Sequence, residues 1–450
     1  MGMRVYLRGL LTLVLATLSI VTVEWSTAEG VDLGTLPGAT APQANVGTAI
    51  DIICPKLRPA NSAQQDLKTQ CDNMKDPTQL QASIGNSGLL GVMTNVTSEQ
   101  TSAQGTNAID ARSTQFRTIG ARLNALRLGA TGVNISGLPL DTSDKTASAI
   151  QPLSLRGLGG GASADSDSRL GMFVNTVGGF GHTDTTSNEI GFDFHNIGVT
   201  AGVDYRFLDS LVAGGAFSYL RTNAEFAASL GDADTNSYGF SLYGTYYVGS
   251  FYVDLLGGFS YNNFDSSRRI VYGTGNLAVD RTAVGDTHGW QYMFNAGTGY
   301  DFHFGGTTLT PYMRMEYLHL NVDGYTESGA NGLDLSVQSQ TIKSLLMVFG
   351  GRVGHAFSVP FGVLVPQIHA EWRHEFLNNS RSITAQFVND PFNQTFIIPT
   401  DNPDRDFAAI GAGVSAVLGK GVAAFFEYEA IVGLRNVASN NFTVGVRVQF

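Results

Sequence analysis

Residues 196–207 read Asn-Ile-Gly-Val-Thr-Ala-Gly-Val-Asp-Tyr-Arg-Phe, and this stretch decides the fold class. Every second residue from Ile197 to Phe207 is apolar or aromatic, whereas the residues between them are polar, charged or glycine. Side chains of a strand alternate between two faces, so a period of two places the apolar set on one face. The stretch is longer than most strands of soluble sheets. A tilted strand that crosses a bilayer with its apolar face outward has this length and pattern.

The same alternation recurs along the chain after Leu170. In one stretch Trp290, Tyr292 and Phe294 lie on one face, and Gln291 and Asn295 lie on the other. Further on, Trp372 and Phe376 lie opposite Arg373 and Glu375. The predicted strands lie near 170–182, 192–207, 211–223, 236–248, 251–263, 289–304, 307–320, 341–357, 362–377, 406–418, 421–432 and 440–450. We therefore predict an all-β fold, a twelve-stranded antiparallel transmembrane β-barrel over residues 169–450, preceded by a small, mostly helical exported segment and a flexible linker.

Connection lengths give independent support for the barrel. Every second gap is short, as at Leu208-Asp209-Ser210, Gly249-Ser250 and Gly305-Gly306, whereas the gaps at 264–288, 321–340 and 378–405 are long. Short periplasmic turns and long extracellular loops are typical of bacterial outer-membrane barrels. The pattern therefore predicts the bacterial outer membrane as the location, with outer-membrane lipid around a monomeric barrel.

The N-terminal part of the chain has a different composition. Residues 1–28 combine Arg4 and Arg8, a short apolar core and small residues before Glu29, which is typical of a secretory signal peptide. We interpret 29–111 as a small passenger-like segment and 112–168 as a helical segment followed by a Gly/Ser-rich linker. Phe116 is the one aromatic residue between 29 and 164, so a large independent core is not expected there.

Cys54 and Cys71 are the two cysteines of the chain. They lie close together in an exported segment, where such a pair usually forms a disulfide. The segment has no histidine to complete a zinc site. We predict a structural disulfide.

Composition argues against several kinds of function. A formal net charge of −11 makes nucleic acid an unsuitable partner. All eight histidines lie after residue 181, so a catalytic triad or a metal site is not expected in the exported segment. His369 and His374 lie five positions apart on one predicted strand and should point to opposite faces. The sequence predicts no enzymatic activity, cofactor, metal or catalytic residue. Cleavage of the chain beside Asp110, Asn124 or Asn134 stays open, although no motif marks it.

The polar faces of the strands predict which charges line the barrel lumen. Charges inside a barrel need partners. The predicted lumen charges are Asp204, Arg206, Arg314, Glu316, Arg352, Glu371, Arg373, Glu375, Glu427, Glu429 and Arg447. Pairing within the wall is the simpler expectation. The alternative is that arginines of a helix at 112–128, which has an apolar stripe from Phe116 to Leu126, occupy the lumen and bind some of the carboxylates.

The last predicted strand ends at Phe450. Its apolar face consists of Phe442, Val444, Val446, Val448 and Phe450. An open sheet edge is not tolerated in lipid, so this strand must pair with the first. The ending resembles the terminal signal that outer-membrane proteins present to the barrel-insertion machinery.

Together these features resemble the autotransporter family of type V secretion. The pieces that carry the resemblance are Gly179-Phe180-Gly181, the run Gly202–Phe207, the run Glu371–Phe376 and the terminal Phe450. The resemblance implies a barrel that exports an N-terminal passenger to the cell surface and anchors it, with periplasmic chaperones and the insertion machinery as partners. The alternative is a porin-like or structural barrel whose N-terminal extension is periplasmic or plugs the lumen.

Overall fold

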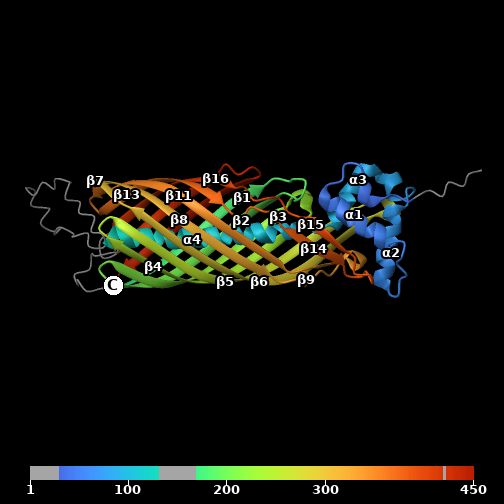
Figure 1. Cartoon of the computed structure of the whole chain (residues 1–450), viewed down its shortest axis with the longest axis horizontal. Helices are drawn as coiled ribbons and strands as arrows, with labels where there is room; N and C mark the ends of the chain where they lie inside the picture. Colours follow the sequence, from blue (N-terminus) through green and yellow to red (C-terminus); the bar gives the residue numbers. More distant parts are fainter. Residues whose placement is uncertain (1–29, 131–168, 419–421, 450) are drawn as a thin grey trace, which may run out of the picture.

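The computed structural model describes residues 30–130, 169–418 and 422–449, and gives the backbone alone for 106–114, 125, 127–130 and 447–449. Figure 1 shows a long tube of tilted strands with a group of helices at one end and the C-terminus at the other. Among the described residues, no helix is both long and apolar enough to cross a membrane.

Twelve long strands of the described chain form a closed antiparallel barrel. They are β1 (Leu170–Thr183), β2 (Phe192–Leu208), β3 (Leu211–Phe226), β4 (Gly231–Val248), β5 (Phe251–Tyr272), β6 (Val279–Tyr300), β8 (Thr307–Val322), β11 (Gln340–His355), β13 (Gly362–Glu375), β16 (Asp406–Leu418), β17 (Val422–Val432) and β18 (Val437–Gln449). The short β7 (Phe302–Phe304) and β12 (Phe357–Val359) pair with β8 and β13 beside two of the tight turns. β18 pairs with β1 from Gly171 opposite Gln449 to Thr183 opposite Val437, which closes the barrel. The predicted fold class is confirmed.

The period of two places apolar side chains on the outer face of the barrel. On β2, Ile197, Val203 and Phe207 are 61%, 47% and 53% exposed, whereas Asn196 and Asp204 face inward and are each 4% exposed. Apolar groups on the outside and polar groups on the inside are stable only where lipid surrounds the wall. This arrangement is the reverse of that in a water-soluble protein, and it follows directly from the alternation in the sequence.

Several strands are much longer than the sequence pattern predicts. β5 and β6 have 22 residues each, and the predicted loop at 264–288 is mostly strand. A strand needs roughly ten residues to cross the bilayer, so these strands continue well beyond it. Beyond the membrane Phe264, Ile270 and Tyr272 are buried on the inner face, and the outer face is polar. The prediction was wrong here because a strand in water lacks the apolar outer face that marked the others.

The other two long gaps are also ordered. Residues 321–340 contain β9 (Tyr325–Thr326), the 3-10 helix η6 (Asn331–Leu333) and β10 (Leu335–Val337). Residues 378–405 contain β14 (Ser382–Phe387) and β15 (Thr395–Pro399). These strands form a second sheet in the order β15-β14-β10-β9. Two sequence-distant connections therefore build one structure above the barrel.

The helices at that end are short and joined by tight turns. They are η1 (Leu33–Thr35), α1 (Ala41–Ile53), α2 (Ser62–Lys75), α3 (Leu80–Val96) and η2 (Glu99–Ser102). Thr40 and Gln43 form a capping box at the start of α1, and Asn61 accepts a hydrogen bond from the Gln64 N–H at the start of α2. No sequence pattern indicated α3, because Gly85, Gly88 and Gly91 disfavour a helix. We call residues 30–102 the cap.

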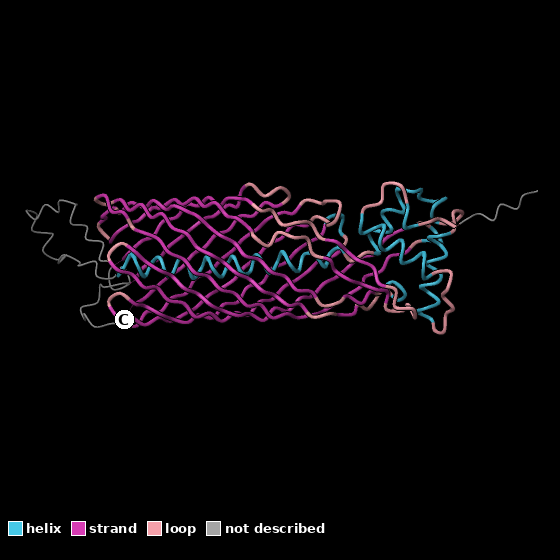
Figure 2. The backbone as a smooth tube through the Cα atoms, viewed as in Figure 1, coloured by secondary structure: helices cyan, strands magenta, loops and turns pink. Residues whose placement is uncertain are grey.

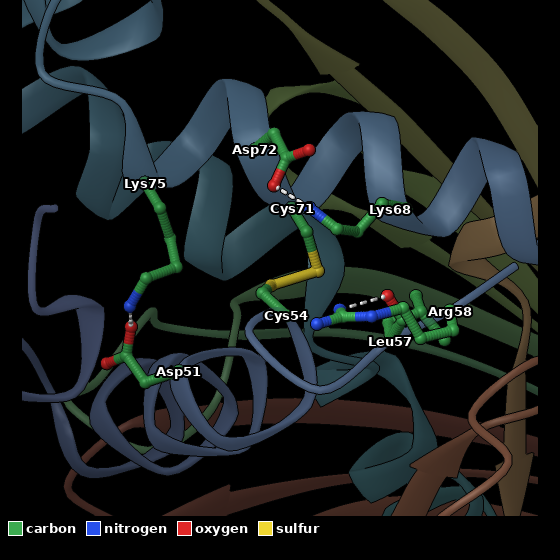
Figure 3. Close-up of a disulfide and its surroundings, with 8 residues drawn as sticks. All are labelled: Asp51, Cys54, Leu57, Arg58, Lys68, Cys71, Asp72 and Lys75. Atoms are coloured by element: carbon green, nitrogen blue, oxygen red, sulfur yellow. Dashed lines mark hydrogen bonds and ion pairs between the residues drawn. A yellow bond between two sulfur atoms is a disulfide. The ribbon is translucent and has the colours of Figure 1, made fainter.

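A disulfide joins the end of α1 to α2. Figure 3 shows Cys54 bonded to Cys71, and their Cα atoms are 5.7 Å apart. Close by, the Lys75 ammonium binds the Asp51 carboxylate and so links the same two helices. The predicted disulfide is confirmed, and by closing a loop of this size it stabilises the cap by about 3 kcal/mol.

Candidate functional site

The helix α4 (Ala103–Ala130) runs through the barrel lumen. Figure 2 shows it along the tube, beginning below the cap and ending at the end of the barrel that carries the short turns. At 1.5 Å per residue its 28 residues span about 42 Å, enough to traverse the barrel. The helical segment predicted at 112–128 lies within it.

One face of α4 packs on an apolar strip of the barrel wall. Phe116, Ile119, Leu123 and Leu126 are buried against side chains from β1 and β3–β6. These wall side chains are Phe173, Val212, Ala216, Tyr243, Tyr247, Tyr252, Leu256 and Met293. An apolar strip facing the lumen is unusual in a polar barrel interior. This strip matches the apolar face of α4 and holds the helix against one side of the lumen.

A buried ion pair joins the helix to the same wall. The Arg122 guanidinium donates two hydrogen bonds of 2.7 Å to the Asp204 carboxylate on β2, and both side chains are under 5% exposed. The guanidinium also lies 5.2 Å from the centre of the Phe173 ring. A bidentate arginine–carboxylate pair fixes both distance and direction. It therefore sets the rotation and the depth of the helix.

Two further hydrogen bonds repeat this attachment along α4. The Gln115 amide donates to the Ser241 hydroxyl at 2.6 Å, and the Asn175 amide donates to the Thr118 carbonyl at 3.1 Å. Gly239 leaves room for Gln115, since a Cβ at that position would lie 2.9 Å from the amide. The helix thus contacts β1 and β4 through specific polar groups as well as through apolar packing.

The opposite wall carries a dense network of charges. Arg314 on β8 binds Glu371 on β13 and Glu316 on its own strand, the latter at 2.7 Å. Arg373 donates to Glu371 at 2.6 Å and to Glu429 at 3.1 Å. Most of these carboxylates pair within the wall. The helix joins the network through Arg117, whose Nη1 is 3.4 Å from Glu429.

The other predicted lumen charges take different partners. Arg206 donates to the Tyr247 hydroxyl at 2.5 Å, and Arg352 lies 5.8 Å from the Tyr312 ring centre. Glu375 accepts from the Leu345 and Leu377 N–H groups, and Glu427 lies 3.4 Å from Nδ1 of the buried His369. The side chain of Arg447 lies outside the described residues.

The last strand has an apolar outer face. Phe442, Val444 and Val446 are 36%, 49% and 49% exposed, and the Phe442 ring stacks 6.2 Å from Phe180 on the neighbouring β1. The side chain of Val448 and the whole of Phe450 lie outside the described residues, as do the predicted signal peptide at 1–28 and the linker at 131–168. Asp110 and Asn134 are not described either, whereas Asn124 borders a small cavity beside Arg352.

The cap has no separate core. Its buried side chains, such as Ile50, Leu67 and Met74, form one cluster with Ile270 and Tyr272 of β5 and with residues of the second sheet. The sequence suggested that the exported segment could not bury much apolar area. The barrel supplies the missing part, through strand extensions that the sequence did not reveal.

Arg268 on β5 is the centre of the attachment between cap and barrel. Its side chain is 2% exposed and binds Glu327 through Nε at 3.0 Å and again through Nη2. Nη1 donates to the Asn95 carbonyl at 2.9 Å at the end of α3, and Nη2 donates to the Leu333 carbonyl at 3.0 Å. One buried cation thus joins the cap, a barrel strand and the loop between β8 and β11.

A second ion pair holds α2 on the barrel. The Arg281 guanidinium of β6 binds the Asp66 carboxylate, with Nη2 at 2.8 Å, and the Gly332 N–H donates to the same carboxylate at 2.9 Å. Burial raises the pKa of Asp66, but these hydrogen bonds outweigh it and hold the pKa below its usual range. Gly332 is required, since a Cβ there would be 2.3 Å from the Leu67 nitrogen.

Two buried acids lie between the cap and the barrel mouth. Burial, and then the nearby Glu189 carboxylate, raise the pKa of Glu99 on η2 to about 8. Burial also raises the pKa of Glu189, whose carboxylate accepts a hydrogen bond from the Asp401 N–H. Glu99 is therefore largely protonated at neutral pH.

A closed twelve-stranded barrel with an apolar outer face, a helix through its lumen and a cap on its long-loop side defines an integral outer-membrane protein. Sequence comparison gives the family. The autotransporter beta-domain model matches residues 172–429, and the chain belongs to this family. It is an outer-membrane autotransporter.

Curated relatives match between 55% and 64% of this chain. Esterase EstA of Pseudomonas aeruginosa is 27% identical over 260 residues, which cover 55% of this chain and 38% of that protein. Outer membrane protein A of Rickettsia conorii is 24% identical over 295 residues, covering 64% of this chain and 14% of the relative. An extracellular serine protease of Serratia marcescens is 22% identical over 288 residues, covering 62% of this chain and 26% of that protein. The chain thus spans little more than a third of the EstA proteins that it matches.

Solved structures of autotransporter barrels are also similar. The translocator domain of NalP from Neisseria meningitidis has a TM-score of 0.49 at 20% identity, covering 64% of this chain and 91% of that one. The beta domain of the Bordetella autotransporter BrkA has a TM-score of 0.43 at 16% identity, covering 63% of this chain and 100% of that one.

Proposed function

We propose that the barrel exports its own short N-terminal segment to the cell surface, where the segment stays attached as the cap. The observation that carries the proposal is the path of α4. The helix starts at the cap, passes through the lumen and ends on the side of the short turns, which are periplasmic in bacterial barrels. The cap on the long-loop side is then extracellular.

The contacts of the cap support retention over release. Ion pairs and a continuous apolar cluster join it to the barrel wall. A segment that shares its core with another part of the chain exposes apolar surface when it leaves. The cap is therefore a permanent part of the surface structure.

The proposed role of the cap is non-catalytic. EstA and the Serratia protein are called an esterase and a protease, but this chain covers only 38% and 26% of their lengths, so their activities are not carried over to it. The cap sequence has no histidine to act as a general base in a triad. It has the polar outer face and the compact, disulfide-linked helices of an interaction module.

Two partners belong to the biogenesis of such a barrel. The apolar face of β18, including Phe442, Val444 and Val446, is the segment that we propose the barrel-insertion machinery binds. Periplasmic chaperones would hold the unfolded strands before insertion. A porin-like channel is disfavoured, because α4 and the charged network occupy the lumen.

Cysteine labelling of intact cells tests the proposal. Ala82 is exposed on α3 and Asp209 lies in a short turn of the barrel, so Ala82→Cys and Asp209→Cys report on the two sides. The native cysteines form a disulfide and do not react. A membrane-impermeant maleimide should label Ala82→Cys in intact cells, and Asp209→Cys only after the outer membrane is opened.

The apparent mass of the labelled protein distinguishes retention from release. Labelled full-length chain in the outer-membrane fraction supports a retained cap. Label on a fragment in the medium would contradict retention. Labelling of Ala82→Cys only in opened cells would contradict surface display and leave a periplasmic extension.

A further inference from the structure

A cavity of about 870 Å³ lies in the extracellular half of the barrel. It lies between Arg117 of α4 and the inner faces of β11, β13 and β18, and the loops that follow β1, β13, β15 and β17 form its rim. This volume is within the range of pockets that hold small molecules. Neither the lumen helix nor the cap fills it.

Hydrogen bonds between the rim loops hold the mouth of the cavity open. Asn188 donates to Asp401 at 2.7 Å, and the Ser380 N–H donates to Asn402 at 2.7 Å. Arg435 binds Asp404 at 2.6 Å. The loops that follow β1, β13 and β17 are each bonded to the loop that follows β15, so four loops are fixed relative to one another without any ligand, as a preformed binding site requires.

Arg381 is a charged residue of the cavity lining with a buried hydrogen-bond donor, Nη1, that has no partner. Its backbone is fixed, because its N–H donates to the Thr400 hydroxyl and its carbonyl accepts from the Thr400 N–H, each at 2.9 Å. Its guanidinium lies against Gly105, where a Cβ would be 2.3 Å from Nη2. Nη1 is buried and has no hydrogen-bond partner. Glu189 attracts the guanidinium electrostatically, yet burial still holds the pKa of Arg381 below its ordinary value.

A guanidinium whose buried Nη1 has no hydrogen-bond partner, in a preformed cavity, indicates a missing anion. The acidic residues of the lining already have partners, as Glu375 and Asp404 illustrate. Their charges disfavour two negative charges on the one group that Arg381 binds, as in a phosphate monoester. A carboxylate, with one charge per sugar, is the better match for the arginine fork.

The rest of the lining narrows the class of ligand. Its hydroxyl and amide side chains are Thr183, Thr186, Asn188, Thr341, Asn379, Ser380, Thr400, Asn402, Asn436, Ser439 and Asn441. Such groups suit the hydroxyls of a sugar, and Phe194 and Phe407 offer rings for its C–H faces. We propose that this cavity binds a carboxylate-bearing saccharide of the uronic-acid class, with the sugar carboxylate on Arg381.

Calorimetric titration of the full-length protein in detergent tests the proposal with two probes. Trigalacturonate supplies the carboxylate and the hydroxyls, and its fully methyl-esterified form keeps the size and removes the charge. Trigalacturonate should bind at least tenfold more tightly than the ester. Equal affinity for the two probes, or no binding of trigalacturonate at millimolar concentration, would overturn the proposal.

Matched variants connect binding to Arg381. Arg381→Gln should weaken trigalacturonate binding at least tenfold, whereas Arg405→Gln, an exposed arginine outside the lining, should bind like the wild type. Gly105→Ala is the second variant, because its methyl group displaces the guanidinium and keeps the charge. It should also weaken binding. Unchanged affinity in both Arg381→Gln and Gly105→Ala would exclude this site.

Two sources could supply such a saccharide, and lipid nanodiscs separate them. In discs of phospholipid alone, added trigalacturonate should bind. If acidic sugars of lipopolysaccharide are the natural ligand, discs that contain lipopolysaccharide should reduce this binding several-fold. If a free saccharide is the ligand, both discs should bind it equally. The site lies at the mouth of the barrel. Its binding test therefore succeeds or fails independently of whether the labelling of Ala82→Cys places the cap at the cell surface.

Discussion

The Arg122 guanidinium and the Asp204 carboxylate form a bidentate ion pair inside the barrel, 82 residues apart in sequence. Around it, apolar packing between α4 and the wall excludes water on one side of the lumen. A buried pair of this kind adds little net stability, but loss of one partner leaves an uncompensated buried charge. The pair therefore determines where the helix lies more than how stable the barrel is.

We expect Asp204→Ala to loosen the lumen helix. Removal of one partner of a buried pair costs roughly 3–5 kcal/mol, so α4 should leave its place in part of the molecules. Single-channel recordings in planar bilayers should show larger and noisier conductance than the wild type. Asp234→Ala, which breaks an exposed pair with Arg221 on the outer face, is the control and should conduct like the wild type. Wild-type conductance of Asp204→Ala would show that packing alone holds the helix.

Arg268→Ala should detach the cap and leave the barrel intact. The substitution strands the buried Glu327 and the carbonyls of Asn95 and Leu333, at a cost of roughly 3–5 kcal/mol. Limited proteolysis should then cut the cap at least tenfold faster, while the barrel keeps its heat-resistant mobility on gels. The neighbouring Arg269→Ala breaks only an exposed pair with Asp280 and should be cut at the wild-type rate.

The disulfide should stabilise the cap alone. Cys54→Ala/Cys71→Ala removes a cross-link worth about 3 kcal/mol in the chain-entropy model. The double variant should insert normally but expose the cap to protease at lower temperature than the wild type. Equal protease resistance of the two proteins would mean that the contacts with β5 and β6 alone determine the stability of the cap.

Two glycines of different surroundings test the packing of cap on barrel. Gly332→Ala forces a methyl group to within 2.3 Å of the Leu67 nitrogen, so α2 must move away from η6. The cap should become protease-sensitive. Gly91→Ala in α3 has nothing within 4 Å of the new methyl group and should stabilise the cap by about 0.5–1 kcal/mol. Equal protease sensitivity of the cap in the two variants would contradict this account of the packing.

Cap attachment should weaken as the pH rises from about 4.5 to about 8. The pKa of Glu99 is raised to about 8 in the folded protein from an ordinary value of 4.5, so the folded state binds more protons in that window. Stability from this group is fully present below about pH 4.5 and is lost as the pH approaches 8. Glu99→Gln removes the ionisation and should stabilise the cap at pH 8 by roughly 4 kcal/mol, with little change at pH 4.5. Cap proteolysis at the two pH values measures the difference.

Part of the lumen site was predictable from sequence. The polar faces of the strands identified Glu371, Arg373 and Glu429, because a period of two assigns a face to each residue without knowledge of its neighbours. A helical spacing of three or four residues identified the apolar stripe of α4. Which groups pair was not predictable. Arg122 binds Asp204, while the neighbouring Arg206 binds Tyr247, and that choice depends on the rotation and depth of a helix inside the barrel.

The sequence by itself determined the barrel, the closure of its last strand on the first, and the disulfide between Cys54 and Cys71. These follow from local patterns, since a strand in lipid must alternate and a sheet in lipid must close. Only the tertiary structure decided how the cap is held. The inner faces of β5 and β6 beyond the membrane are apolar only because α1–α3 cover them, and the cap has a core only because those strands extend. Neither the cap sequence nor the strand extensions contain a local pattern that predicts this interface. The interface is stabilised only when residues as distant in sequence as Asn95 and Arg268 come together.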